Sequence, residues 1–113
     1  MTARNKLLTS PPYAVEQSLR RLGADLRTAR LRRNLTIADI AEKIGTGSRA
    51  IADAEKGKPS TAVAVYTAIL WAMDLLSQLD EVGRPENDAE GQSIALSNER
   101  GRARGKTELS NDF

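Results

Sequence analysis

Apolar residues recur along the first half of the chain at spacings of three and four, the period of an α-helix packed on one side. The first such stripe follows Pro11-Pro12 and predicts a helix that runs to about Arg33. The apolar members of this stripe are Val15, Leu19, Leu22, Leu26 and Ala29. Most arginines of the segment lie off the stripe, namely Arg20, Arg21, Arg27, Arg30, Arg32 and Arg33.

A second, shorter helix is predicted after the break at Asn34-Leu35. Thr36 offers a hydroxyl as N-cap, and Asp39 stands three residues later, the spacing of a capping box. The apolar face of this helix consists of Ile37, Ile40, Ala41 and Ile44. Gly45 suits a left-handed residue at its C-terminal end, because glycine has no Cβ to clash there.

A third helix is predicted from about Ser48 to Lys56, with Ile51 and Ala54 facing inward and Gly57 ending it. Glycine at position 47 is a tolerable N-cap, only tenths of a kcal/mol worse than a hydroxyl residue. Two short helices joined by a glycine turn are typical of the helix-turn-helix unit.

A fourth helix is predicted after Lys58-Pro59, with Ser60 as its cap, and it is apolar on almost every side through Met73. Such a helix must be covered on every side, and three small helices cover only one face. A second copy of the chain is the simplest cover for the rest. The candidate dimer interface is Tyr66, Ile69, Leu70, Trp71 and Met73. The alternative is that Leu75, Leu76 and Leu79 fold back over this face.

The composition changes after Gly83-Arg84-Pro85, where polar residues and glycines leave few apolar positions. We therefore expect a flexible arm over residues 1–11, a helical domain over 12–82 and a polar, weakly ordered tail over 83–113. A short helix is predicted within the tail over 89–98. No internal repeat or period-two strand pattern is found, so the predicted fold class is all-α, with four to five helices.

The chain has 113 residues and contains neither cysteine nor histidine. This composition excludes disulfides and thiolate zinc sites, and it removes the commonest general base and metal ligand. The net charge is +2, but residues 1–35 hold eight Lys/Arg against two Asp/Glu, giving +6. A basic first third suits a phosphate-bearing partner, although a solvated basic helix would have the same charge.

No secretory signal is predicted, because only Leu7-Leu8 follow the early basic residues. The longest uncharged run, 59–73, is shorter than the roughly 20 residues that cross a bilayer. These observations predict a soluble, cytoplasmic protein.

The segment from Leu31 to Gly57, LRRNLTIADIAEKIGTGSRAIADAEKG, resembles the lambda-repressor-like, or XRE, helix-turn-helix family. The pattern comprises a threonine cap, an alternating Leu/Ala core, a turn glycine, an isoleucine in the recognition helix and Glu-x-Gly. Here these elements are Thr36, Ile40-Ala41, Gly45, Ile51, Glu55 and Gly57. Ile37 departs from the pattern, because a glutamine that often contacts phosphate usually stands there.

The resemblance implies which residues contact double-stranded DNA. Base-reading or adjacent positions are Thr46, Gly47, Ser48, Arg49, Ala52 and Asp53. Arg49 has the planar fork that grips guanine, and Asp53 is a possible acceptor from cytosine. Asp53 could instead form an i,i+4 ion pair with Arg49, and Ser48 could simply begin the helix. Arg33 and Lys58 are candidates for phosphate contacts or solvated cations, while Arg30 and Glu55 match a structural pair that ties the first helix to the third.

Residues 41–80 also resemble HipB-type antitoxins of this family, which repress their own operon and bind a HipA-type kinase toxin. The tail allows two further roles. Its basic residues Arg100, Arg102, Arg104 and Lys106 could lie along phosphates or in a minor groove. Leu109 and Phe113 could anchor on a protein partner. A solvated tail without a role is the alternative.

The leading hypothesis is a dimeric, autoregulating repressor that binds a palindromic operator and requires no cofactor. The alternative is a protein-only adaptor that binds a kinase without recognising DNA. An enzyme is disfavoured, because no carboxylate pairs with a base or nucleophile and no Gly-Lys-Ser/Thr phosphate loop occurs. No metal ligands are predicted.

Overall fold

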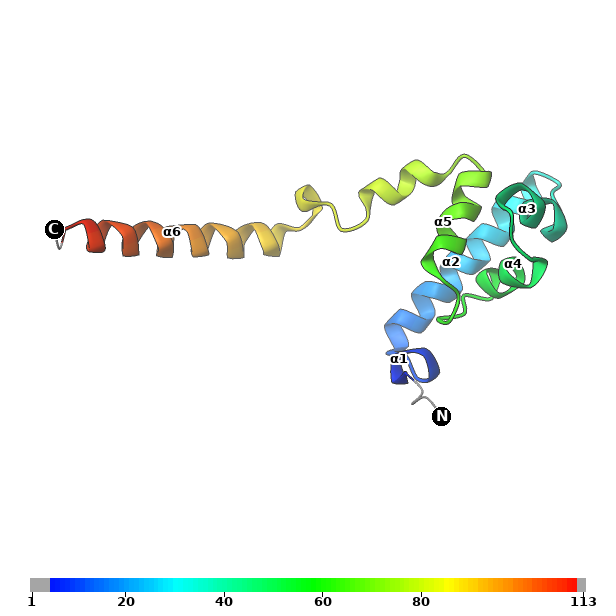
Figure 1. Cartoon of the computed structure of the whole chain (residues 1–113), viewed down its shortest axis with the longest axis horizontal. Helices are drawn as coiled ribbons and strands as arrows, with labels where there is room; N and C mark the ends of the chain where they lie inside the picture. The colour runs from blue at the N-terminus through cyan, green and yellow to red at the C-terminus, as the bar shows by residue number, and fades with distance from the viewer. Residues whose placement is uncertain (1–4, 112–113) are drawn as a thin grey trace. The chain divides into compact units, whose positions relative to one another are not determined.

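A computed structural model describes the backbone of residues 5–111 and the side chains of residues 5–103. All regular structure over residues 5–111 is helical (Figure 1), which confirms the all-α prediction. The chain divides into two compact units, Met1–Leu79 and Asp80–Phe113. The sequence pattern places this boundary slightly later, after residue 82.

The described part of the first unit, from residue 5 on, contains five α-helices. They are α1 (Lys6–Thr9), α2 (Tyr13–Arg32), α3 (Ile37–Ile44), α4 (Ser48–Glu55) and α5 (Val63–Ala72). A 3-10 helix, η1 (Leu76–Glu81), runs across the boundary, and the second unit contains η2 (Pro85–Asn87) and α6 (Ala89–Asn111). The turn of helix in α1 was not predicted, and Asn5 caps it by accepting a hydrogen bond from the Leu7 N–H at 2.9 Å.

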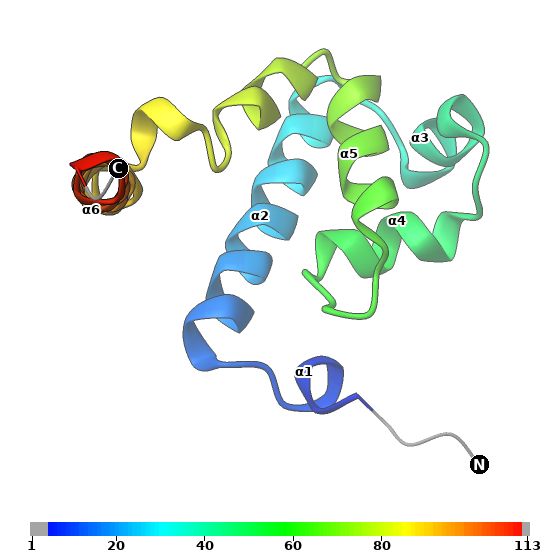
Figure 2. The ribbon, with the colours of Figure 1, turned by 60° about the vertical axis from the view of Figure 1, so that its left-hand side comes forward.

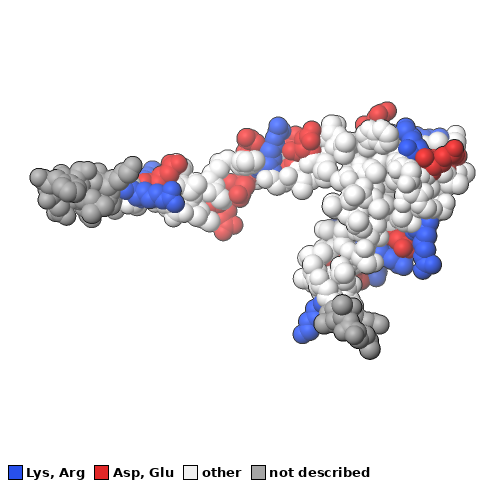
Figure 3. Space-filling view, viewed as in Figure 1, with Lys and Arg blue, Asp and Glu red and all other residues white. Residues whose placement is uncertain are grey.

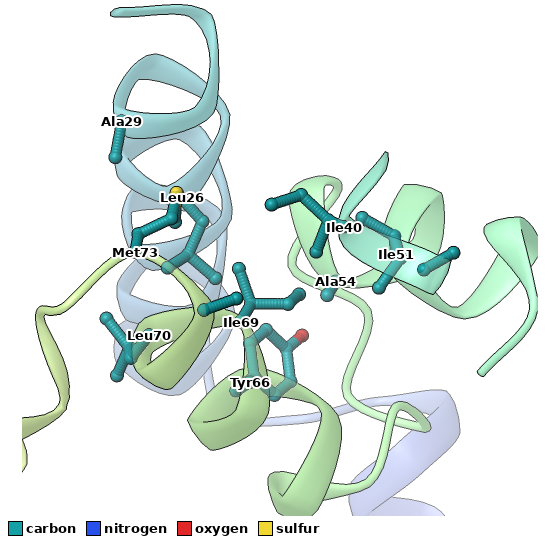
Figure 4. Packing of buried hydrophobic residues seen from close by; sticks show 11 residues of the cluster. Leu26, Ala29, Ile40, Ile51, Ala54, Tyr66, Ile69, Leu70 and Met73 are labelled. Atoms are coloured by element: carbon teal, nitrogen blue, oxygen red, sulfur yellow. The ribbon is translucent and has the colours of Figure 1, made fainter. Parts of the chain in front are cut away.

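The core of the first unit lies where α2, α3, α4 and α5 meet (Figure 4). Each helix contributes at least one side chain with almost no exposed surface. These residues are Leu26 from α2, Ile40 from α3, Ile51 from α4 and Ile69 from α5, with Met73 just after α5. The predicted α2 stripe reaches this core only from Leu19 onward, because Val15 is 42% exposed.

The predicted capping box at the start of α3 is present. The Asp39 N–H donates to Thr36 Oγ1 at 3.0 Å, and the Thr36 N–H donates to Asp39 Oδ2 at 2.8 Å. The pKa of the Asp39 carboxyl is lowered, chiefly because its ionised form accepts the Thr36 backbone N–H and, second, because it interacts with the Thr36 side chain. At the other end, Gly45 has φ 76°, the left-handed conformation expected of this glycine.

The backbone of α2 lies directly against the backbone at the C-terminal end of α4. A Cβ on Gly23 would lie 2.5 Å from the Ala54 carbonyl oxygen and 2.6 Å from that of Glu55. Figure 2 shows α2 passing beside α4 and α5 in this unit. Because glycine has no Cβ, position 23 allows α2 to pack this closely against α4.

Helix α5 begins at Val63, so the predicted cap at Ser60 is wrong. The Thr61 N–H donates to the Lys58 carbonyl at 3.1 Å, and this turn occupies the segment where the helix was expected to start. Ala62 is the N-cap residue, and no side chain caps the helix.

The dimer interface predicted on α5 is also largely wrong. Tyr66, Ile69, Leu70 and Met73 are between 1% and 8% exposed, because they pack into the core of their own chain. Trp71 alone of the five is exposed, at 52%. The apolar sequence of α5 therefore reflects mainly burial within one chain.

The second unit contains the predicted helix over 89–98, but α6 continues to Asn111. The Gly91 backbone N–H donates to Asp88 Oδ1 at 2.9 Å, and the Gln92 side-chain Nε2 donates to the Pro85 carbonyl at 2.9 Å. The side chain of Leu109 and the whole of Phe113 lie outside the described residues.

Candidate nucleic-acid interface

Helices α3 and α4 form a helix-turn-helix, and local bonds shape its turn. The N–H groups of Gly45 and Thr46 both donate to the Ala41 carbonyl, at 2.9 and 3.0 Å, and so close the end of α3. Gly47 then adopts an extended conformation as the N-cap of α4, and no side chain caps that end. The first N–H groups of α4 therefore keep capacity for an anion.

The first turn of α4 presents Ser48 and Arg49 to solvent, because the buried side of the helix is held by Ile51 and Ala54. Both inward side chains have 0% exposure. Of the other proposed DNA contacts, Thr46 and Gly47 are exposed, whereas Ala52 and Asp53 are half-buried. The two central site residues thus stand clear of the globule, as the helix-turn-helix interpretation requires.

Asp53 pairs with Lys58 and not with Arg49. The Lys58 ammonium lies 3.2 Å from Asp53 Oδ1, which corrects the i,i+4 alternative considered from the sequence. Among the described residues, none forms an ion pair or side-chain hydrogen bond with Arg49. Its guanidinium is consequently available to an external acceptor.

Arg30 and Glu55 join α2 to the end of α4. Arg30 Nε donates to Glu55 Oε2 at 2.7 Å, and Nη2 donates to Oε1 at 2.9 Å. The two side chains are only 9% and 6% exposed, and Nη1 donates to the Leu35 carbonyl at 2.9 Å. The hydrogen bond to Glu55 raises the pKa of Arg30. This pair joins α2 to the end of α4 and so orients α4.

Arg33 is engaged within the fold, against the expectation of a free phosphate contact. Its guanidinium donates to the Ala29 carbonyl at 2.9 Å and to the Met73 carbonyl at 3.2 Å. Lys43 similarly donates to the Ala72 carbonyl at 2.9 Å and lies 5.7 Å from the Trp71 ring centroid. Two cations thus satisfy carbonyls at the end of α5, where the helix dipole favours positive charge.

Lys58 is likewise engaged by Asp53, so neither predicted phosphate contact is a free cation. Sequence reasoning missed Lys56, which is exposed and follows the recognition face of α4. The signal was its spacing of seven residues from Arg49, because positions i and i+7 share a helix face. Figure 3 shows Lys and Arg atoms gathered on the edge of the first unit around α4.

The described residues include no group of three or more acidic side chains placed to hold a metal ion. No described helix is both long and apolar enough to cross a membrane.

Comparison with known families gives one match. Residues 26–72 match the protein family described as Helix-turn-helix. Neither curated proteins nor solved structures give a match. The matched segment extends from Leu26 in α2 to Ala72, the last residue of α5, and so includes α3, α4 and the Arg30–Glu55 pair. Residues 26–72 therefore form a helix-turn-helix domain of the lambda-repressor-like type, which is a DNA-binding domain.

Proposed function

We propose that the chain is a sequence-specific transcriptional repressor that reads duplex DNA with α4. The observation that carries this proposal is the exposed first turn of α4, where Ser48 and Arg49 project from a helix anchored by Ile51 and Ala54. An α-helix fits the major groove, and an arginine fork can contact guanine O6 and N7 together. Each such contact discriminates between bases by about 1–3 kcal/mol.

Binding-site selection from a random duplex library tests this function. The selected sites should share a motif, and the selected duplex should bind far more tightly than a random one. Arg49→Ala should relax the preference at one base position and leave binding to random duplexes nearly unchanged. Arg21→Ala is a matched control, because Arg21 is exposed on α2 and, among the described residues, its side chain bonds only to Ser18. Selection that enriches no motif would overturn the proposal.

We further propose a dimer that binds two half-sites about one helical turn, or 34 Å, apart. The exposed apolar residues on α5, Val63 and Trp71, support this proposal as the remaining surface of that helix. We expect the selected motif to have two-fold symmetry. We also expect the binding curve to depend on dimer formation. A single asymmetric half-site bound by a monomer would contradict it.

An antitoxin role, with a kinase toxin as partner, is the finer form of this proposal and rests on the resemblance of residues 41–80. It predicts that the full chain co-purifies with a kinase expressed from the same operon, and that Arg49→Ala keeps this partner while losing base specificity. A protein-only adaptor predicts the same partner affinity without any selected DNA motif. Selection and co-purification together therefore distinguish the two.

A further inference from the structure

Helix α6 has no packed face within the described part of its own unit. It contacts η2, and Gln92 supplies the hydrogen bond that joins the two elements. Two of its apolar side chains, Ile94 and Leu96, are 53% and 54% exposed. Helices in proteins are stabilised mainly by packing of a face, so a helix without one offers its surface to an external partner.

Charge along the second unit shows which kind of partner fits. Residues 80–90 contain five Asp/Glu and one Arg, whereas residues 100–106, RGRARGK, contain four Lys/Arg and no acidic residue. Arg100 and Arg102 are exposed, and neither forms an ion pair with any residue that the structure describes. The basic segment therefore lacks a counter-charge among the described residues and suits an anionic partner.

The helical period separates these basic positions into two edges. Helix α6 runs without interruption through them (Figure 1), and successive residues turn by about 100°. Positions 100 and 102 therefore lie about 200° apart, on opposite sides of the helix, and positions 104 and 106 repeat these two sides. Gly101 lies on the face between the edges, and a Cβ added there meets nothing within 4 Å. The side chains of Arg104 and Lys106 lie outside the described residues.

Two basic edges on one helix match the major groove of duplex DNA. The groove is about 12 Å wide and is bordered by one phosphate strand on each side. An α-helix with its side chains is about 10–12 Å across, so cations on its opposite sides can each reach a different strand. A glycine on the face between them lets the helix approach the floor of the groove. The acidic residues 80–90 are repelled by phosphate, which limits the contact to the C-terminal half of α6.

We propose that α6 is a second DNA-binding element, whose C-terminal half lies in a major groove with Arg100 and Arg102 on opposite phosphate strands. This inference rests on the proposed function and adds a sequence-independent contact to base reading by α4. A second contact on the same chain binds at a high effective concentration. It should therefore raise the affinity for every duplex and leave the base preference unchanged.

The test measures the affinity of the full chain for a random-sequence duplex between about 50 and 200 mM salt. Arg100→Ala and Arg102→Ala should each lower the slope of log affinity against log salt by about 0.9, and the double variant by about 1.8. The selected duplex should lose the same affinity as the random one. Helix content measured by circular dichroism should not fall, because alanine favours the helix at least as well as arginine.

Arg84→Ala is the control within the same unit. Arg84 Nη1 lies 3.0 Å from Glu81 Oε1, and its Nε lies 3.4 Å from Glu86 Oε2, so its charge is already neutralised. This variant should keep the wild-type slope. Replacing Arg100 and Arg102 together by lysine should also keep it, because both charges remain.

Gly101→Leu tests the face between the two edges. The added side chain should weaken DNA binding, because it occupies the space between the helix and the base edges. A merely structural role of position 101 predicts the opposite sign, since leucine favours a helix more than glycine does. Binding that strengthens would overturn the placement of this face in the groove.

The remaining outcomes are separable. A double variant with the slope of Arg84→Ala would overturn the assignment of α6 and leave recognition by α4 intact. A slope lowered by only one of the two arginines would overturn the placement between two strands. Loss of helix content together with the slope would make the arginines structural, and an altered sedimentation at unchanged slope would assign them to a protein contact. Either result overturns the proposal, whereas a wild type that binds no duplex overturns the proposed function itself.

Discussion

Arg30 and Glu55 share two parallel hydrogen bonds, of 2.7 and 2.9 Å, across the interface between α2 and α4. Because both side chains are almost fully buried, each charge depends on the other for solvation. Glu55→Ala should therefore lower the free energy of unfolding by about 3–5 kcal/mol, the cost of an uncompensated buried charge. Urea unfolding measures this loss.

Replacing both partners by apolar residues provides the control. Arg30→Met with Glu55→Leu should recover most of the stability, because neither charge is then buried alone. A single variant as stable as the wild type would show that water solvates the remaining charge.

Gly23→Ala should destabilise the first unit and disturb DNA binding. The new Cβ would meet backbone oxygens of Ala54 and Glu55 at 2.5 and 2.6 Å, and backbone atoms cannot rotate away. Overpacking of this kind typically costs about 1–3 kcal/mol, measured as a lower midpoint in urea. Gly101→Ala is the control, because nothing lies within 4 Å of its added Cβ. A stable Gly23→Ala variant would mean that α2 and α4 can separate without cost.

The capping box at Thr36 and Asp39 should make stability depend on pH. The folded state lowers the pKa of Asp39 below its ordinary 3.8, so the ionised carboxylate favours folding. This contribution is present above the ordinary pKa and is lost as the pH falls through the lowered one. Unfolding by urea at about pH 6 and about pH 3 should show a smaller acid loss for Asp39→Asn than for the wild type. Equal acid losses would contradict the assignment.

The threonine hydroxyl of the same box gives a separate test. Thr36→Ala should lower the free energy of unfolding by about 1 kcal/mol at neutral pH, because the Asp39 N–H loses its acceptor. Thr36→Ser keeps that acceptor and should stay close to the wild type. Equal losses in the two variants would assign the effect to something other than the cap.

Substitutions at Ile69 and at Trp71 should distinguish an effect on folding from an effect on dimer formation. Ile69 is 1% exposed, so Ile69→Ala should cost about 2–5 kcal/mol in urea unfolding. Trp71 is 52% exposed, so Trp71→Ala should leave each chain folded, while sedimentation should show a weaker dimer. A Trp71→Ala protein that remains as dimeric as the wild type would move the interface away from α5.

Helix boundaries set by local chemistry could be predicted from the sequence. The cap at Thr36 and the left-handed Gly45 depend on residues within a few positions of one another. Such bonds and conformations do not require knowledge of the rest of the fold. The Arg30–Glu55 pair was anticipated through family resemblance, because its members lie 25 residues apart.

The sequence could not predict which side of α5 packs into the core, or which groups the basic side chains contact. An apolar helix has no sequence signal for which side meets its own core, so Tyr66 and Ile69 were assigned to a partner chain. Likewise, Arg33 reaches the Met73 carbonyl only because α2 and α5 end close together. These contacts are made by tertiary packing between distant segments.

The most direct measurement compares wild type and Arg49→Ala for binding to the selected duplex and to a random one, at several salt concentrations. Recognition by α4 predicts that the substitution removes about 1–3 kcal/mol of discrimination, roughly 5- to 150-fold, between the right and wrong base at one position. Affinity for the random duplex should change far less. Unchanged discrimination at every position of the motif would contradict the central claim that Arg49 reads bases.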